Sequence, residues 1–289
     1  MVVAHRGASA ALPEHTLAAY RRAVDAGADG LECDVRLTAD GHLVCVHDRR
    51  LERTSNGRGV VSTMELQQLS ALDFGSWKDS RTDNEAPDVV DQERREVLTL
   101  DRLLEYVVDC GRRVELAIET KHPTRYAGLV ERRLVETLDR FGWAHPRLGE
   151  RSQARVMSFS WMSLRRMDTL APSLPTVYLM DRVPLNLRDG SLPLHVGIVG
   201  PSIEVLRAHP RYVERVHSRG GQVHCWTVDE PEDVELCLQL GVEAIITNRP
   251  GRVLDQVRRF EQGLPGHKES TVAVHATGPT VPSEPPETA

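Results

Sequence analysis

Two acidic residues, Glu32 and Asp34, stand two positions apart in an apolar run that we expect to form a strand over residues 30–35. Side chains separated by two positions on a strand point to the same face of the sheet. Two carboxylates held close together inside a sheet repel one another and lose hydration unless a cation lies between them. The pair therefore indicates a metal site. The alternative is an edge strand that exposes both carboxylates to solvent, a pattern less usual for parallel sheets.

A second strand-like run over 114–120 carries Glu119, and Lys121 follows on the same face. In an α/β barrel the active site lies at the C-terminal ends of the strands, so Glu119 is a better candidate than Glu115, which is nearer the start. Glu119 would complete a set of three carboxylates with the pair described above. Oxygen ligands suit Mg²⁺ or Ca²⁺ rather than zinc. A plain ion pair between Glu119 and Lys121 is the alternative.

Two histidines also follow apolar strand-like runs. His5 ends the first run and precedes Arg6, while His47 ends the run over 43–47 and precedes Asp48. Imidazoles titrate near neutral pH, so a pair of them can divide the proton transfers of a hydrolysis, each typically contributing about 10² to 10⁴ in rate. Taken singly, each dipeptide could instead be structural or an incidental surface feature.

Short apolar runs alternate with segments of helical period along the chain, a pattern typical of repeated βα units around a parallel sheet. The run at 43–47 would pair with its predecessor as a hairpin, which leaves eight barrel strands. Strands are expected at 2–5, 30–35, 43–47, 114–120, 154–159, 175–180, 195–199, 222–227 and 243–247. Helices are expected at 16–26, 99–109, 126–141, 161–170, 203–218, 231–240 and 251–261.

Residues 49–98 interrupt this alternation with a polar stretch that contains one plausible short helix, near 63–71. An insertion of this size between strands usually forms a lid or small cap over the site. From Gly263 the sequence becomes rich in Gly, Pro, Ser, Thr and Glu, which predicts a disordered tail. We therefore expect one α/β domain over 1–262, a TIM-type (β/α)8 barrel with an inserted cap, and a tail over 263–289.

The charge balance argues against nucleic acid as a partner. The chain holds 36 Lys plus Arg against 42 Asp plus Glu, a formal charge of −6, and no block of basic residues that could follow a phosphate backbone. A small-molecule substrate is the expected partner, and the oligomeric state is open.

The sequence favours a cytoplasmic protein without a membrane anchor. Met1 leads within four residues to His5, which leaves no room for a signal peptide, and no apolar run approaches the length of a membrane span. The odd set of cysteines contains no CxxC pair, and we expect these residues to be reduced and mostly buried: Cys33, Cys45, Cys110, Cys225 and Cys237.

Four segments occur in an order and at spacings that resemble the glycerophosphodiester phosphodiesterase family. They read HRGxSxxxPExT from His5, GLExDVxLTxDGxxVxxHDxxLxRTxxGxG from Gly30, IExK from Ile118 and WTVD from Trp226. The resemblance spans roughly residues 2 to 260, and the second segment is highly specific. It implies a TIM-type barrel that binds a divalent metal and hydrolyses glycerophosphodiesters to sn-glycerol 3-phosphate and an alcohol.

By position, the resemblance implies a role for each of eight residues. His5 and His47 would be the acid and the base, and Glu32, Asp34 and Glu119 would bind the metal. Arg6 and Lys121 would contact the phosphate. Trp226 would be the aromatic residue near the glycerol. Trp226 could instead be a barrel-core aromatic. One departure is His15, where the family's motif has asparagine, and this bears on hydrogen bonding at the helix start.

Two other functions fit parts of the same pattern. A phospholipase D or C-like barrel acting on lysolipids also uses two histidines and a metal, although such enzymes are typically secreted and disulfide-bearing. A non-catalytic barrel that binds a phosphorylated metabolite would be expected to lack one of the catalytic residues, and none is missing here. The sequence does not identify the alcohol, the choice between Mg²⁺ and Ca²⁺, the nucleophile, or which histidine is the acid.

Overall fold

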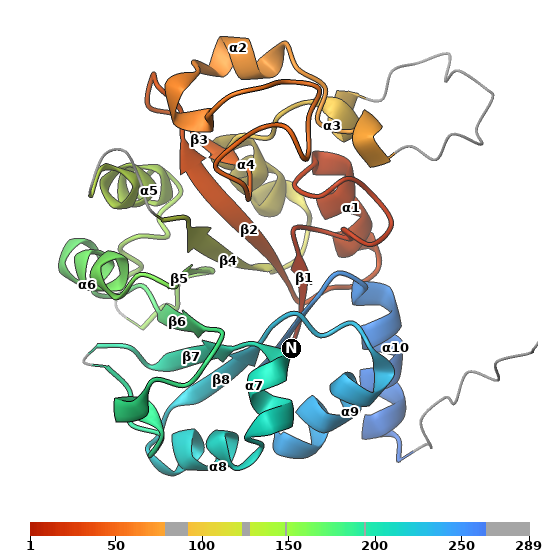
Figure 1. The fold of residues 1–289 in the computed structure, drawn as a ribbon, viewed down its shortest axis with the longest axis vertical. Coiled ribbons are helices and arrows are strands. Elements are labelled where there is room, and N and C mark those ends of the chain that lie inside the picture. Colours follow the sequence, from red (N-terminus) through yellow and green to blue (C-terminus); the bar gives the residue numbers. More distant parts are fainter. Residues whose placement is uncertain (79–91, 123–127, 148, 194, 264–289) are drawn as a thin grey trace, which may run out of the picture.

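The computed structural model describes residues 1–78, 92–122, 128–147, 149–193 and 195–263. Eight parallel strands form a closed ring because the last, β9, pairs with the first, β1. The ring contains β1 (Val2–His5), β2 (Gly30–Leu37), β4 (Glu115–Thr120), β5 (Ala154–Ser158), β6 (Thr176–Met180), β7 (Ile198–Pro201), β8 (Gln222–Cys225) and β9 (Ala244–Thr247). This arrangement confirms the predicted TIM-type barrel (Figure 1).

The remaining strand, β3 (Leu43–Cys45), is antiparallel to β2 and stands outside the ring, as the predicted hairpin requires. The first half of β2 pairs with β1, through Glu32, whereas residues from Val35 onward pair with β3. β3 therefore pairs with the part of β2 that extends beyond β1. His47, which follows β3, consequently lies just past the C-terminal end of the barrel.

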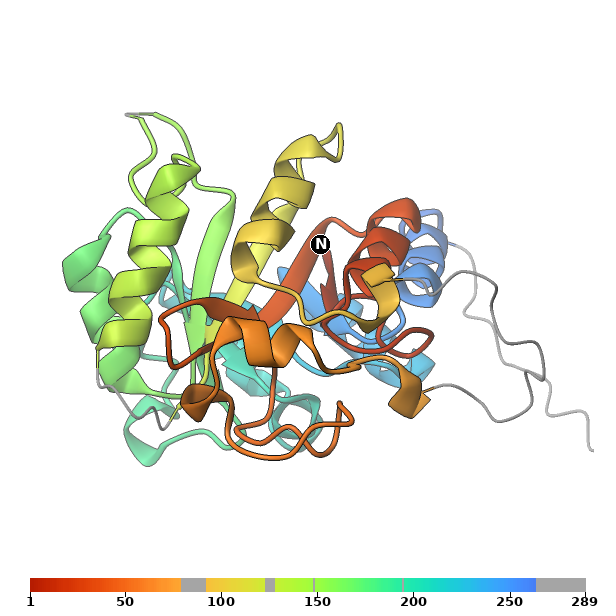
Figure 2. The same cartoon turned by 90° about the horizontal axis from the view of Figure 1, so that it is seen from above.

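Helices surround the ring and, except between β6 and β7, return the chain to the start of the next strand of the ring (Figures 1 and 2). Thr16, Thr99 and Ser160 cap three of them with side-chain oxygens, and Pro231 and Pro250 occupy the first turn of two others, where proline needs no hydrogen bond. They are α1 (Leu17–Asp25), α4 (Leu100–Asp109), α5 (Leu129–Arg140), α6 (Trp161–Leu170), α7 (Ile203–Ala208), α8 (Arg211–Ser218), α9 (Pro231–Leu240) and α10 (Pro250–Glu261).

The expected regular alternation of strands and helices is wrong in two places. The helix predicted over 203–218 is two helices, because Pro210 disfavours helical backbone at His209, whose φ of −138° and ψ of 59° end α7. Between β6 and β7 the described residues form only the 3-10 turn η3 (Leu185–Leu187). Pro210 signalled the break between α7 and α8 in the sequence, but the continuous apolar periodicity over 203–218 favoured a single helix.

Apolar side chains fill the interior of the ring. Val3, Ala117, Met157, Val177 and Ile246 are among the buried residues of this inner cluster, and Trp226 packs against it. Larger apolar clusters lie between the strands and the surrounding helices. A barrel packed in this way is a solid core and not a pore, so its polar chemistry must take place at the open end.

We call residues 49–98 the cap segment. Within its described part, α2 (Leu66–Ser70) matches the predicted short helix, and η1 (Val61–Thr63), η2 (Ser76–Lys78) and α3 (Gln92–Arg95) were not predicted. Leu51, Val61, Leu69 and Phe74 form a small buried cluster with Val44 and Val46 of the preceding hairpin. This cluster attaches the polar segment to the barrel (Figure 2).

All five cysteines are unpaired, and four of them are buried. No helix in the described ranges has both the length and the apolar character to cross a bilayer. The predicted disordered tail falls, from residue 264, outside the described residues, and the cytoplasmic location stays a prediction.

Candidate active site

Three carboxylates of β2 and β4 meet at the C-terminal end of the barrel. The strands are in register so that Asp34 lies opposite Glu119, and Glu32 precedes Asp34 on the same face of β2. One oxygen atom from each of these residues lies within 4.8 Å of the others, and all three side chains are buried. The alternative acid, Glu115, lies at the opposite end of β4 and pairs with Arg155, 2.9 Å away.

The charges of this cluster are poorly compensated by the protein alone. Burial and the carboxylates of Asp34 and Glu119 raise the pKa of Glu32 well above its usual value. Burial and Asp34 likewise raise the pKa of Glu119 to about 7. Burial also opposes ionisation of Asp34, yet Lys121, His15 and Arg6 hold its pKa well below the usual range. Oδ1 of Asp34 faces Nζ of Lys121, 3.0 Å away.

A divalent cation fits this donor set. Buried carboxylates need a positive charge to stay ionised, and three oxygen donors close together are the ligands that Mg²⁺ and Ca²⁺ prefer. Lys121 supplies part of that charge, since its Nζ lies 2.7 Å from Glu119 and 3.0 Å from Asp34. The ion pair that the sequence offered as an alternative is therefore present within the cluster.

His5 lies at the end of β1, directly opposite Glu32 in the register. Its Nδ1 is 2.7 Å from the side-chain oxygen of Asn248, and its Nε2 is 3.9 Å from Glu32. Asn248 donates its amide to Asp229, so its oxygen faces His5 and accepts the Nδ1 proton. Burial and the nearby Arg6 lower the pKa of His5 to about 4, which leaves Nε2 with a free lone pair.

His47 reaches the site from the end of the β3 hairpin and is only partly buried. Its Nδ1 lies 2.7 Å from Oδ1 of Asp48, so the adjacent acid does orient the ring. Burial lowers the pKa of His47, and the carboxylate of Asp48 opposes that effect. The two histidines therefore differ in their partners, because His5 faces a neutral amide and His47 a carboxylate.

An ion-pair network connects the two histidine loops. Arg53 donates to Asp48 and also makes two bonds of 2.8 Å to Glu14. Glu14 in turn accepts from Arg6 at 2.9 Å, and Nε of Arg6 lies 3.0 Å from Asp34. Because Arg53 belongs to the cap segment, this network holds the cap against the loop that follows β1.

A pocket of about 310 Å³ opens beside the cluster. His47, Glu119 and Lys121 contribute to its lining, together with Arg36, Asp48, Arg49, Thr120, His122, Ser158, Phe159 and Ser160. Trp226 is not one of the residues that line this pocket. Its indole donates to the carbonyl of Gly200 at 2.6 Å, and its ring meets Phe159 edge to face with centroids 5.4 Å apart. Both a core role and a place beside the pocket are therefore compatible with Trp226.

Sequence reasoning missed several residues that orient the site. His15 contacts Asp34 and the hydroxyl of Tyr20, while Asn248 and Asp229 hold His5. The start of α1 keeps its cap despite the departure at His15, because Thr16 accepts from the Ala19 N–H. The signals available were the departure of His15 from the motif and the presence of Asp229 in the WTVD segment. The partners of His5 come from the far end of the chain and share no local pattern with it.

Comparisons with known proteins identify the family of the chain. Residues 5–252 match the model of the glycerophosphoryl diester phosphodiesterase family. A Mycobacterium tuberculosis protein named probable glycerophosphodiester phosphodiesterase 1 is 53% identical over 254 residues, which are 87% of this chain and 90% of that protein. The glycerophosphodiester phosphodiesterase of Bacillus subtilis is 34% identical, over 86% of this chain and 84% of that protein.

Solved structures show the same fold. A phosphodiesterase of Oleispira antarctica, determined in complex with its product sn-glycerol-3-phosphate, superposes with a TM-score of 0.75 over 89% of this chain and 96% of that one. At 24% sequence identity, this likeness concerns the fold alone. Together with the family match, the barrel and the motifs, these relatives show that the chain belongs to the glycerophosphoryl diester phosphodiesterase family and is a phosphoric diester hydrolase.

Proposed function

We propose that the protein hydrolyses glycerophosphodiesters to sn-glycerol 3-phosphate and an alcohol, with a divalent cation bound by Glu32, Asp34 and Glu119. The observation that carries the proposal is that these buried carboxylates converge within 4.8 Å at the same end of the barrel as His5 and His47. Water and the diester are the reactants, and one P–O bond is broken.

The proposed cation would be Mg²⁺ or Ca²⁺, because the donors are all oxygens. When bound, it would neutralise charge on the phosphate oxygens and polarise the phosphorus. The raised pKa values of Glu32 and Glu119 support this role, since they mark a repulsion that a cation would relieve.

His5 and His47 would divide the proton transfers. One accepts a proton from the nucleophile, and the other donates a proton to the oxygen of the leaving alcohol as the P–O bond breaks. The contacts of Asn248 with His5 and of Asp48 with His47 support these roles, because each fixes one ring nitrogen and leaves Nε2 for the substrate.

Arg6 and Lys121 would contact the phosphate. Both are largely buried cations beside the carboxylate cluster, and each lies 3.0 Å from Asp34. In a site shielded from water, such charges stabilise the negative charge that develops in the transition state. Trp226, which meets Phe159 of the pocket lining, would lie on the glycerol side.

A substrate panel tests the proposal. Purified protein, treated with chelator and then reloaded with Mg²⁺ or Ca²⁺, should release sn-glycerol 3-phosphate from glycerophosphodiesters with different alcohols. The products should be separated from cyclic phosphate and from phosphocholine. Release of phosphocholine alone would reverse the assigned side of cleavage. Full activity in the chelated protein would exclude the cation from the mechanism.

The nucleophile can be identified in the same assay. If water attacks, sn-glycerol 3-phosphate appears without a delay. If the glycerol hydroxyl of the substrate attacks first, a cyclic phosphate precedes it. The geometry of the carboxylate cluster is the same for both routes, so the time course of the products decides between them.

A further inference from the structure

Arg49 lies next to the site without belonging to the family's motif residues. It follows His47 and Asp48, is exposed, and lines the same pocket as His47 and Lys121. Its backbone is anchored, because its carbonyl accepts the N–H of Val61 at 3.1 Å at the start of the cap segment. The side chain therefore starts from a fixed point at the rim of the pocket.

The other charges of the pocket lining have partners among the described residues. Arg36 donates twice to the carbonyl of His47, at 3.0 and 2.7 Å, and Lys121 lies between Asp34 and Glu119. Asp48 is shared by His47 and Arg53.

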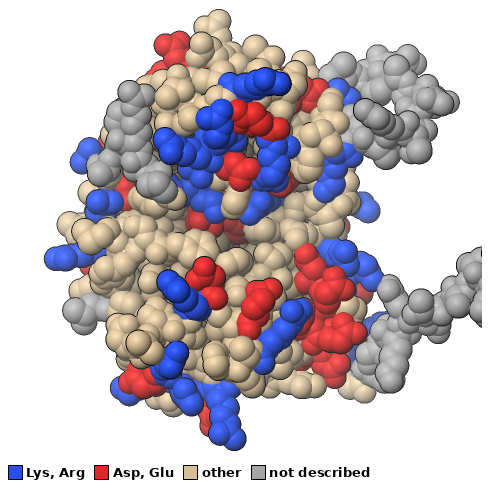
Figure 3. Space-filling model, viewed as in Figure 1, with Lys and Arg blue, Asp and Glu red and all other residues tan. Residues whose placement is uncertain are grey.

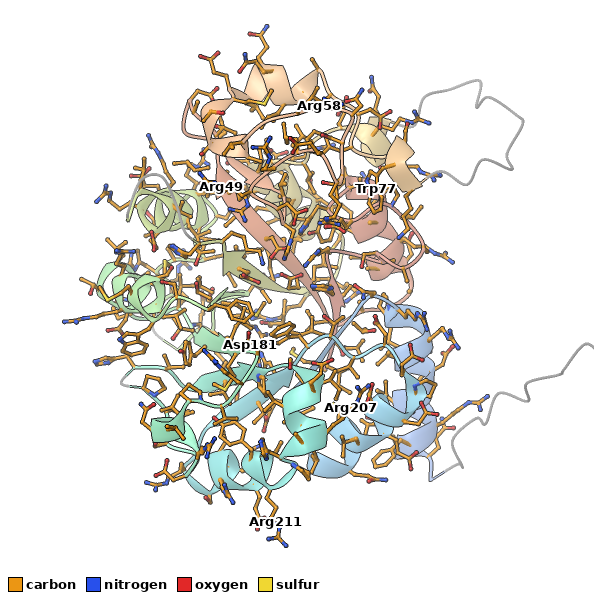
Figure 4. The ribbon with its side chains drawn as sticks, viewed as in Figure 1. Arg49, Arg58, Trp77, Asp181, Arg207 and Arg211 are labelled. Carbon is orange, nitrogen blue, oxygen red and sulfur yellow. The ribbon has the colours of Figure 1, made fainter. Side chains whose placement is uncertain are left out.

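Arg49, by contrast, makes no ion pair or side-chain hydrogen bond with any described residue. Figure 3 shows that Lys and Arg side chains gather over this part of the surface, and Figure 4 shows Arg49 beside the end of β2. Among the described residues that line the pocket, Arg49 therefore offers a positive charge without an ion-pair partner to a bound ligand.

The glycerol position proposed above would put Arg49 on the side of the leaving alcohol. Trp226, the proposed neighbour of the glycerol, follows β8, which is three strands away from β2 around the ring. Arg49 follows β3, which pairs with β2. With the glycerol toward β8, we place the alcohol toward the β2 side of the pocket, which Arg49 lines.

We propose that Arg49 is a specificity residue that favours alcohols bearing a second anionic group, such as a phosphomonoester, over cationic alcohols such as choline. A guanidinium binds phosphate oxygens through paired hydrogen bonds, and it repels a quaternary ammonium group. This inference rests on the proposed function, since it concerns the alcohol of the same reaction.

Two substrates that differ by one group test it. They are sn-glycero-3-phosphoglycerol and the same diester with a phosphomonoester on the distal glycerol, and the measured quantity is the ratio of their kcat/KM values. The wild-type ratio should favour the phosphorylated diester. Arg49→Gln should lower the ratio roughly fivefold, as expected for an exposed charge contact, and Arg49→Lys should keep part of it.

The control is Arg211→Gln, which removes the same charge from an exposed position on α8, far from Arg49 in Figure 4. It should leave the ratio unchanged. The wild-type preference should also shrink at about 0.5 M salt because exposed charges are screened. A wild-type ratio at or below one, or the same ratio in Arg49→Gln, would overturn the inference while sn-glycerol 3-phosphate is still released. Absence of that product from both substrates would contradict the proposed function itself.

Discussion

Nε2 of His15 lies 2.9 Å from Oδ2 of Asp34, so a residue of the loop after β1 fixes one of the three proposed cation ligands. Its Nδ1 lies 2.8 Å from the hydroxyl of Tyr20, and that hydroxyl donates its proton to the carbonyl of Glu32 at 3.1 Å. His15 adopts the left-handed backbone conformation, with φ of 61°. Asparagine, the usual residue of the motif, tolerates that conformation better than most residues.

Replacing His15 should reveal how much this contact stabilises the barrel. In His15→Ala, Asp34 and Tyr20 each lose a buried partner, and alanine is strained in the left-handed region. The free energy of unfolding should fall by about 2 to 4 kcal/mol. His15→Asn should lose clearly less. Urea unfolding without divalent cations measures both, and equal losses in the two variants would contradict this role.

The pairing of Asp48 with His47 predicts a shift in the pH profile of kcat/KM. The carboxylate stabilises the protonated imidazole and so raises the pKa of His47 against the effect of burial. Asp48→Asn removes this stabilisation, so the pKa of His47 should fall and one limb of the profile should move to lower pH. The limb that moves identifies His47 as base or acid. Two unmoved limbs would exclude His47 from the titrations that control turnover.

Cation affinity should rise with pH. Because the pKa of Glu119 is raised to about 7, this carboxyl is mostly protonated at pH 6, and a cation must displace its proton. Affinity should therefore increase about tenfold from pH 6 to pH 8, with proton release. Titration calorimetry in buffers of different ionisation enthalpy measures both quantities. Glu115→Gln, at the far end of the same strand, should retain this dependence, and a pH-independent affinity in the wild type would contradict it.

The fold and the carboxylate cluster could be predicted because their signals are local. Glu32 and Asp34 are two residues apart on one strand, and the position of Glu119 near the end of its own strand was enough to place it beside them. The ends of parallel barrel strands meet at one rim, so strand positions alone place polar residues together.

The remainder of the site depends on contacts between distant segments. Asn248 reaches His5 across 243 positions, and Arg53 reaches Glu14 across 39, without any spacing pattern to indicate either pair. These contacts arise from the closure of β9 onto β1 and from the folding of the cap segment onto the barrel. No helix was predicted between β6 and β7, and the described residues there form a short 3-10 turn, which leaves no helical period in the sequence.

The most direct test of the central claim measures bound cation and turnover in the same samples. Equilibrium dialysis followed by elemental analysis should find one divalent cation per wild-type chain. Glu32→Gln and Glu119→Gln should lose both the cation and turnover. His47→Ala should keep the cation and lose at least about 100-fold in turnover. Full cation binding in both glutamine variants, or near wild-type turnover in His47→Ala, would contradict the account.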